Sequence, residues 1–313
     1  MKTQNIILGC LLILLIIFAF PCLSVSQVPA AFVDIGYGAR PMGMGGAFTA
    51  LTHDAHSVLW NPAGLTRLKN TNATFMWTKQ FSLIPYYFFA AGTPISKSMA
   101  MGTAIISSGN NVLRETTAFF SIAYKRSSPT KSFFKNISVG LNFKFRNSSF
   151  GNNSDGGEDR IQGNACGFAM DFGVQWKISP RFMTGLMLRD FVSPISYNNE
   201  TLDKFYTESV PPTLILGVAY LAIKNLILTA DWAKVLLEDN TNKINAGMEY
   251  KILKKFILRA GFSQPIEAES NRKYNLGLGL FFTKKRKFSL CFDFAYEIFF
   301  LANTPKVSTT IWF

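Results

Sequence analysis

Apolar and polar residues alternate along most of the chain from about residue 70 to its end. In residues 137–146 (ISVGLNFKFR), Val139, Leu141 and Phe143 fall on one face, while Asn142 and Lys144 fall on the other. The segments AMDFGVQWK, INAGMEYKI and SLCFDFAYEI repeat this pattern. An apolar face opposite a small or polar face, in segments of about ten residues, is typical of the strands of a transmembrane β-barrel. A soluble β-sandwich also alternates, but it cannot easily bury so many aromatic faces.

The alternation predicts an all-β fold, a transmembrane antiparallel β-barrel of about 14 strands within residues 70–313. The expected strands cover residues 70–79, 84–93, 97–109, 115–126, 135–146, 164–177, 181–189, 211–222, 226–234, 242–252, 255–264, 273–283, 288–298 and 305–313. An even number is expected when both ends of the barrel chain lie on the same side of the membrane. The 30 Phe residues and the lack of a spanning-length apolar run after residue 26 agree with a barrel.

Charge divides the predicted connections into two sets. Short connections such as KISPR, IKN and KKRK are basic, whereas most of the 19 acidic residues lie at the opposite end, with the long connections 147–164 and 190–212. Barrels of this kind have short periplasmic turns and longer external loops. We therefore expect the basic end to meet anionic lipid headgroups of the inner leaflet of an outer membrane.

Charged residues also occur in the middle of predicted strands, in opposite phase to the apolar stripes. They are Asp171, Asp231, Glu249, Arg259 and Asp293. A charge that faces lipid near the middle of a bilayer costs roughly 2–4 kcal/mol for Arg or Lys and less for acids. These five side chains are therefore predicted to face the lumen and to pair with one another or with Arg40, which precedes the barrel.

The first 26 residues have the pattern of a secretory signal peptide. A basic start at Lys2 is followed by an apolar core over residues 6–20 and by small residues, which predicts cleavage near Ser26–Gln27. A membrane anchor is the alternative, although the apolar core is shorter than the ~20 residues of a spanning helix. Lipidation at Cys22 is a weaker alternative because Pro21 precedes it where a small residue is usual.

Two cysteines, Cys166 and Cys291, remain after Cys10 and Cys22 leave with the signal peptide. Both lie in strand-like segments, so we expect structural roles, with a single bridge between them as the alternative. The net charge of +13 comes without a helical basic stripe or a nucleic-acid motif. On an exported chain this charge favours a membrane surface over nucleic acid as the partner.

The last strand, PKVSTTIWF, ends on Phe313 with alternate apolar residues on one face. A C-terminal strand that closes on an aromatic residue resembles the signal read by the barrel-insertion machinery of outer membranes. We therefore expect Phe313 to serve as an insertion signal.

A segment rich in glycine precedes the first strand and contains GARPMGMGGAFTA and HDAHSVLWNPAGL. It lacks the Lys-Ser/Thr of a phosphate-binding loop and the spacing of a dinucleotide-binding loop. His53 and His56 flank Asp54, which leaves a metal site as an alternative, but a third ligand would have to be found elsewhere. No predicted strand carries a histidine, so Ser-His catalysis is not expected. We predict no enzymatic activity, no cofactor and no resident metal.

Packing is the remaining role for this segment. Gly43, Gly45 and Gly46 allow one backbone to approach another closely, and Asn61-Pro62 marks a fixed turn. Residues 27–69 are therefore predicted to form a compact hatch or plug in the lumen. We expect the turn that contains Trp60, Asn61, Pro62, Ala63 and Gly64 to hold this hatch against the inner wall near the base of the first strands, with the glycine run close by. Whether the hatch is a gate or a static stopper stays open at this point.

The run from Gly38 to Leu65 resembles the N-terminal region of PorV/PorQ-type outer-membrane proteins, within the wider FadL-like superfamily. The MGMGGAF run, the Asn61-Pro62-Ala63-Gly64 motif, NAGMEYKILKKFILRAGF, NLGLGLFF and the terminal strand carry the resemblance. It implies a fourteen-stranded barrel whose N-terminal segment folds into the lumen. FadL relatives admit fatty acids and other hydrophobic molecules, whereas PorV relatives carry secreted proteins in type IX secretion.

The predicted connections between strands are short, which favours passage of hydrophobic molecules over the carrying of secreted proteins. The predicted function is passage of a hydrophobic small-molecule ligand through a monomeric barrel in the outer membrane of a Gram-negative-type bacterium. The alternative is a non-enzymatic, PorV-type component of type IX secretion that holds or presents secreted proteins at the surface. Outer-membrane lipid and the barrel-insertion machinery are the other expected partners.

Overall fold

The computed structural model describes residues 36–110, 112–126, 136–151, 161–236, 242–253, 255–266, 271–284 and 288–313. The predicted signal peptide, residues 1–26, and the first residues of the predicted hatch lie outside this part of the chain. Within the described residues, no helix has the length and apolar character needed to cross a membrane.

Short helices come first and strands follow. The helices are α2 (Ala39–Gly43), α3 (Ser57–Trp60) and the 3-10 helix η1 (Pro62–Arg67). The strands are β1 (Asn72–Gln80), β2 (Ile84–Pro94), β3 (Met99–Gly109), β4 (Leu113–Lys125), β5 (Ile137–Phe150), β6 (Gly163–Lys177), β7 (Phe182–Val192), β8 (Pro194–Asn199), β9 (Lys204–Ser209), β10 (Thr213–Ile223), β11 (Leu226–Val235), β12 (Asn242–Ile252), β13 (Phe256–Pro265), β14 (Lys273–Lys284), β15 (Phe288–Phe299) and β16 (Thr304–Trp312).

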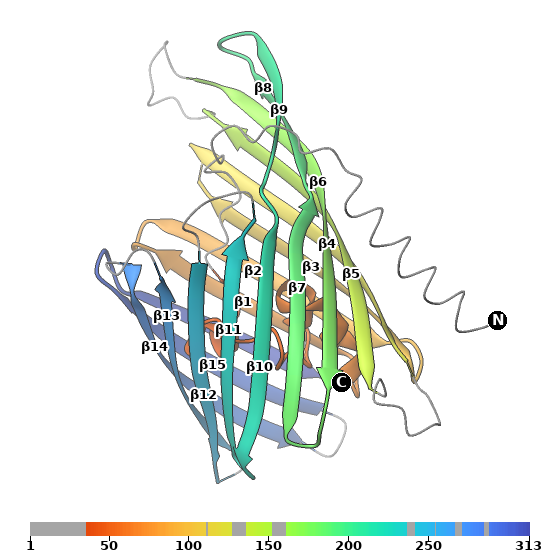
Figure 1. Ribbon diagram of the computed structural model, residues 1–313. Coiled ribbons are helices and arrows are strands. Elements are labelled where there is room, and N and C mark those ends of the chain that lie inside the picture. Colours follow the sequence, from red (N-terminus) through yellow and green to blue (C-terminus); the bar gives the residue numbers. More distant parts are fainter. Residues whose placement is uncertain are drawn as a thin grey trace, which may run out of the picture.

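The strands form a closed antiparallel barrel (Figure 1). Each strand of the ring pairs with its neighbours in sequence order, β1 pairs with β16, and β7 pairs with β10 across the β8–β9 connection. Of the 16 strands in the described residues, 14 form the ring. The predicted all-β barrel and its strand number are confirmed, and the first-to-last pairing leaves no open edge in the ring.

Strands β8 and β9 stand outside the ring, in a stretch that the sequence presented only as a long connection. β8 pairs with the first part of β6, and β9 pairs with β8, so the two extend the sheet beyond the barrel wall (Figure 1). The alternation was not evident there because these strands are short and β9 is exposed on both faces over most of its length.

The two faces of the wall differ as the alternation predicts. In β5, Asn142, Lys144 and Arg146 are buried, whereas Phe143 and Phe145 are 37% and 64% exposed. The exposed apolar side chains face away from the lumen, where a bilayer would cover them. The barrel therefore places its polar groups inside and its aromatic residues outside.

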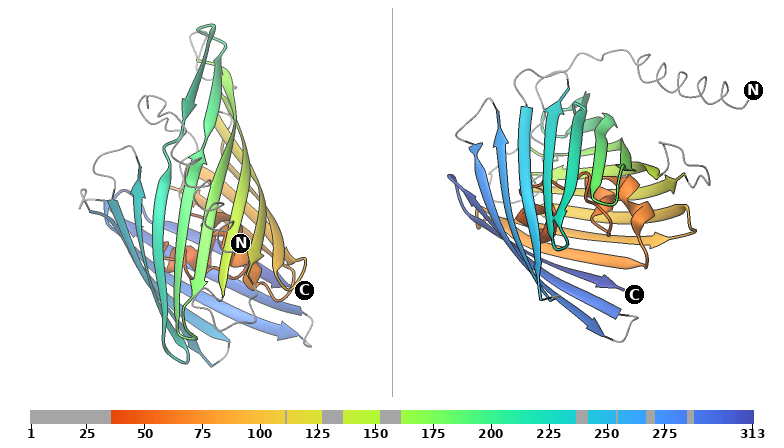
Figure 2. Two further views of the ribbon diagram at one scale, coloured as in Figure 1. Left: turned by 45° about the vertical axis from the view of Figure 1, so that its right-hand side comes forward. Right: turned by 60° about the horizontal axis from the view of Figure 1, so that its bottom comes forward.

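Residues 36–68 lie inside the ring, where Figure 2 shows the short helices enclosed by strands. Their buried side chains, such as Met44, Phe48, Val58 and Leu65, form one apolar cluster with inward-facing residues of the wall that include Phe88. Most of this segment has no regular secondary structure, so small residues rather than long helices fit it to the wall.

Glycines face each other where the segment meets β13. Gly45 has φ +65°, and a Cβ on it would lie 2.5 Å from the backbone nitrogen of Phe262. A Cβ on Gly261, across this contact, would meet the backbone of Met44 and Gly45. Two backbones therefore touch without side chains between them, which only glycine permits.

We expect Gly45→Ala to destabilise the barrel more than Gly46→Ala does. Both positions have positive φ, which costs an alanine about 1–2 kcal/mol, but only at Gly45 does the new methyl group collide with backbone, whereas at Gly46 it meets the Trp60 ring at an ordinary 3.4 Å. Overpacking adds about 1–3 kcal/mol. The temperature at which heat-modifiable gel migration is lost measures the difference. Equal losses in the two variants would contradict the close packing.

Candidate functional site

The interface between the inner segment and the wall contains most of the polar residues singled out from the sequence. Asn61 lies at its centre and is fully buried. Its side-chain oxygen accepts a hydrogen bond from the Ala63 amide (3.2 Å), which caps η1, while its Nδ2 donates to the carbonyls of Thr49 and Val174 (3.0 Å each). One amide side chain thus joins the turn, the inner segment and β6.

From the sequence we expected the turn to pack near the base of the first strands. In the structure it also packs against β5 and β6. Gly140 and Gly173 face Pro62 so closely that a Cβ on either would collide with it. Leu65, in the same 3-10 helix, reaches Gly92 and Gly102 of β2 and β3. The glycine run contacts β13 and β14 instead, so the two motifs touch different parts of the wall.

Gly64 is needed for space rather than for an unusual backbone conformation. Its φ lies outside the left-handed region, but a Cβ would lie 2.7 Å from the carbonyl oxygen of Thr52. Trp60 is also buried, donates its Nε1–H to the carbonyl of Tyr37 (2.9 Å), and packs edge-on against Phe48. Trp60 therefore connects the start of the segment to its middle.

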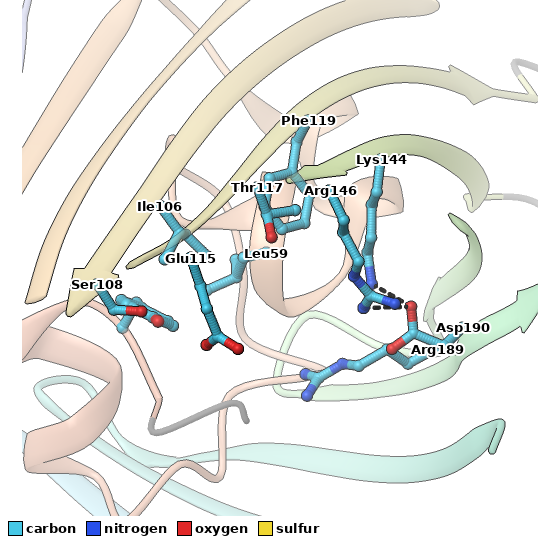
Figure 3. Close-up of a pocket in the computed structure, with 11 residues that line it drawn as sticks. Leu59, Ile106, Ser108, Glu115, Thr117, Phe119, Lys144, Arg146, Arg189 and Asp190 are labelled. Carbon is cyan, nitrogen blue, oxygen red and sulfur yellow. Dashed lines mark hydrogen bonds and ion pairs between the residues drawn. The ribbon is translucent and has the colours of Figure 1, made fainter. Parts of the chain in front are cut away.

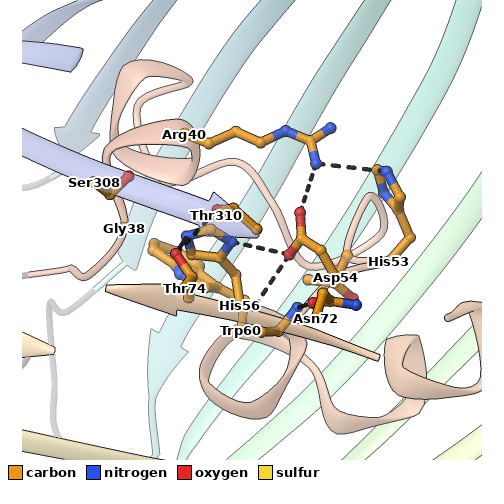
Figure 4. Close-up of polar contacts among 12 residues, drawn as sticks. Gly38, Arg40, His53, Asp54, His56, Trp60, Asn72, Thr74, Ser308 and Thr310 are labelled. Atoms are coloured by element: carbon orange, nitrogen blue, oxygen red, sulfur yellow. Dashed lines mark hydrogen bonds and ion pairs between the residues drawn. The ribbon is translucent and has the colours of Figure 1, made fainter. Parts of the chain in front are cut away.

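Arg40 is the charged link between segment and wall. Figure 4 shows its contacts within the segment, with Asp54 and His53. Its guanidinium donates to Asp54 (2.7 Å) in the segment and makes two bonds to Glu249 of β12 (2.9 and 3.0 Å). Burial disfavours the charge on Arg40, but Glu249 and Asp54 outweigh that effect and raise its pKa above the usual value. Arg40 is therefore a permanent cation inside the lumen.

The other predicted lumenal charges join the Arg40 network, bond to the backbone of the segment, or pair with a separate cluster. Arg259 bonds to Glu249 and to Asp293 (2.7 Å each), which extends the Arg40 network across β12, β13 and β15. Asp231 instead accepts the backbone amides of Phe48 and Thr49 (3.0 Å each). Each carboxylate is thus paired or bonded to backbone, as buried charge requires.

Asp171 pairs with a separate charged cluster, whose members Lys144, Arg146 and Asp190 line a small cavity of about 60 Å³ (Figure 3). Lys144 bonds both Asp171 (2.7 Å) and Asp190 (2.8 Å), and Arg146 bonds Asp190 (2.9 Å). Asp190 has φ +57° beside the register shift between β6 and β7, and its amide donates to Asp171 (2.8 Å). Sequence reasoning placed Asp190 in a loop, because a bulge leaves no signal in the alternation.

Both histidines have hydrogen-bond partners within the inner segment or the wall. His56 is fully buried, with Nδ1 2.9 Å from Asp54 and Nε2 near Thr74 (3.4 Å). His53 donates from Nδ1 to the carbonyl of Leu51 (2.9 Å), which leaves Nε2 as the acceptor toward Arg40 (3.5 Å). Burial, followed by the positive charge of Arg40, lowers the pKa of His53 to about 4. Burial would raise the pKa of Asp54, but His56, Arg40 and His53 hold it well below its usual value.

The remaining predicted residues lie away from this interface. Cys166 is exposed and Cys291 is buried, and both thiols are free. Phe313 is 57% exposed, and its backbone amide donates to Thr71 (2.9 Å) beside β1. Its role as an insertion signal stays a prediction.

Residues 54–311 match the family model of the type IX secretion system membrane protein PorP/SprF. The chain belongs to this family. The more specific resemblance to PorV/PorQ-type proteins, whose PorV members act in the same secretion system, stays a prediction. No curated protein matches this PorP/SprF member.

Several solved structures with a similar fold are hydrocarbon and FadL-type channels. They include the CymD monoaromatic hydrocarbon channel (TM-score 0.64, 14% identity, 90% of this chain and 97% of that one). The Pseudomonas putida toluene transporter TodX has TM-score 0.59 and 11% identity over 88% and 97% of the two chains. A Pseudomonas aeruginosa FadL homologue has TM-score 0.57 and 12% identity over 85% and 95%. The PorP/SprF barrel therefore resembles FadL-type transporters in fold.

We expect Arg40→Gln to loosen the inner segment without opening the wall. The change leaves Glu249 with Arg259 but removes its bond to the segment, and loss of one partner from a buried ion pair costs about 3–5 kcal/mol. Hydrogen exchange should speed up in residues 38–60 and stay slow in β5 and β6. Lys273→Gln, which breaks a pair between two strands (Lys273–Glu297, 3.0 Å), is the matched control. Unchanged exchange in the segment would show that Arg40 does not hold it.

A pH dependence follows from His53. Its pKa is near 6.5 when unfolded and about 4 when folded, so the folded state binds the proton less readily. Its contribution to stability is complete above about pH 6.5 and is lost as the pH falls toward 4. Thermal unfolding in detergent should show this decline, and His53→Gln should remove that part of it. A decline of the same size in the variant would contradict the assignment.

Proposed function

We propose that this PorP/SprF member is a non-enzymatic outer-membrane component of type IX secretion that binds secreted proteins or their carriers at the cell surface. The family match carries the proposal, since it covers the second half of the inner segment and the strands through β16. Family and fold neighbours are described as secretion, transport or channel proteins, which supports a role without catalysis.

The inner segment occupies the lumen, which supports binding of proteins at the surface over passage of proteins through the barrel. The inner segment contacts β5 and β6 through Pro62, β13 through Gly45 and β12 through Arg40. We infer that residues 36–68 act as a static plug, because movement of the segment would break backbone packing and leave Glu249 and Asp54 short of a partner. A protein would then pass beside the barrel or dock on it rather than cross it.

The β8–β9 hairpin is the surface that we infer takes the protein partner. Leu202, Phe205 and Tyr206 are 54%, 73% and 43% exposed, and Tyr206 stacks on Tyr197 with ring centroids 5.1 Å apart. Among the described residues, β9 pairs with β8 alone, which leaves one strand edge open. An open edge beside exposed aromatic residues is a surface on which an extended segment of another protein can add as a strand.

Passage of hydrophobic small molecules is the second candidate. The observation that favours it is the resemblance to monoaromatic hydrocarbon channels over nearly the whole chain. On this alternative the inner segment would be a gate, and a small rearrangement at its contact with the wall would open a path.

Secretion and uptake can be separated with one pair of variants. Phe205→Ser combined with Tyr206→Ser removes the aromatic surface of the hairpin, and Leu253→Ser changes a residue that is 81% exposed in the turn between β12 and β13. In a strain with type IX machinery, we expect the double variant to lower secretion of a type IX substrate about tenfold at normal barrel abundance. The Leu253 variant should secrete normally.

Toluene uptake in the same strains tests the second candidate. We expect uptake to be unchanged by deletion of the gene. Normal secretion together with lost toluene uptake in the deletion strain would overturn the secretion role and support hydrophobic passage.

A further inference from the structure

A polar cavity of about 210 Å³ lies between the inner segment and the wall formed by β10 to β15. Its wall residues come from the strand ends that carry the long connections, among them Val235 at the end of β11, Lys243 at the start of β12 and Lys273 at the start of β14. Gly46, Thr49 and Trp60 of the inner segment close the opposite side. Arg189 lines this cavity and also the smaller one beside Asp190.

Four neighbouring strands each contribute a buried polar residue to this cavity. Asp231, Asn245 and Ser263 are direct cross-strand partners on β11, β12 and β13, and Asn275 follows on β14. All four residues are at most 7% exposed. They form a continuous row across the inner face, which we call the polar row.

Atoms of the polar row lack partners within the described chain. They are Asp231 Oδ1, Asn245 Oδ1, Ser263 Oγ and both Nδ2 and Oδ1 of Asn275. Buried polar groups in folded proteins are almost always hydrogen-bonded. So many unpartnered atoms in one row, beside a cavity, indicate that an occupant supplies their bonds.

The chemistry of the row defines that occupant. Three of its atoms only accept, one only donates, and the serine hydroxyl can do either. The ligand must therefore offer several donors and at least one acceptor, as a set of hydroxyl groups does. The Trp60 ring adds an apolar surface against which C–H groups can pack.

Charge and size narrow the choice. The lining carries charges of both signs, with Arg189, Lys243 and Lys273 against Asp231 and Glu297. Lys273 is paired with Glu297 (3.0 Å), and this mixture gives neither an anion nor a cation a clear advantage over a neutral ligand. The described residues contain no group of three or more His, Cys, Asp or Glu side chains that could hold a metal ion. A volume of about 210 Å³ corresponds to roughly seven waters at about 30 Å³ each.

We propose that this cavity is a binding site for a small neutral polyhydroxylated molecule of monosaccharide size. Water fills the polar row in the free protein, and the hydroxyl groups of the ligand replace it. The inference does not depend on the role in secretion, since it rests on the lumenal wall and not on the hairpin.

Titration calorimetry on the purified barrel in detergent tests the proposal, with glucose, galactose and N-acetylglucosamine as probes. We expect at least one sugar to bind with a Kd in the millimolar range or below. Asn275→Leu removes both unpartnered groups of one side chain while it keeps the number and branching of the side-chain heavy atoms, and it should weaken binding at least tenfold. Ser263→Ala should weaken it severalfold and serves if the leucine variant does not fold.

Thr229→Val is the matched control. Thr229 is a buried residue on the same strand as Asp231, but it donates to the carbonyl of Gly247 (3.3 Å) and does not line the cavity. Its variant should bind the sugar as the unchanged protein does. The proposal is overturned if no sugar binds at concentrations on the order of 100 mM, where a millimolar ligand saturates. Binding that is unaffected by both site variants would overturn it equally.

Discussion

A chain that crosses a bilayer as strands must satisfy its own backbone hydrogen bonds, because lipid offers no partner for them. Here the pairing of β1 with β16 meets this requirement by closing the ring. Closure has a second consequence, since it creates an interior that neither lipid nor a conventional core fills. The inner faces therefore carry Asn, Asp, Glu, Lys and Arg, and residues 36–68 supply the groups that bond to many of them.

The interface inside the barrel is mixed in character for this reason. Where the segment meets glycines of the wall, such as Gly140 and Gly261, contact is backbone to backbone and excludes water. Where it meets charges, Arg40 and the amides of Phe48 and Thr49 neutralise or bond the carboxylates. The two kinds of contact support each other, because close packing strengthens ion pairs by lowering the local dielectric.

The strands could be predicted from sequence because lipid outside and a polar lumen inside impose a strict period of two. The phase of residues such as Asp293 follows from the same constraint. Bulges and long-range pairings cannot be predicted from this period. For that reason Asp190 was placed in a loop, and its bonds to Lys144 and Arg146 were not foreseen. The small residues of the inner segment predict close packing, but the part of the wall that each one touches depends on barrel geometry, as the contacts of Pro62 with β5 and β6 illustrate.

Whether the inner segment can move follows from where its contacts lie. A lid hinged at one end would be held firmly at that end and weakly elsewhere. Instead, Asn61 bonds to β6, Asp231 of β11 holds Phe48 and Thr49, Gly45 touches β13, and Ser308 of β16 accepts the amide of Ala39. Motion about any one of these points would break the others and expose buried charge. We infer that resemblance to hydrocarbon channels in fold need not bring a moving hatch, and that a fixed plug leaves the outer rim and the polar cavity as the surfaces available for function.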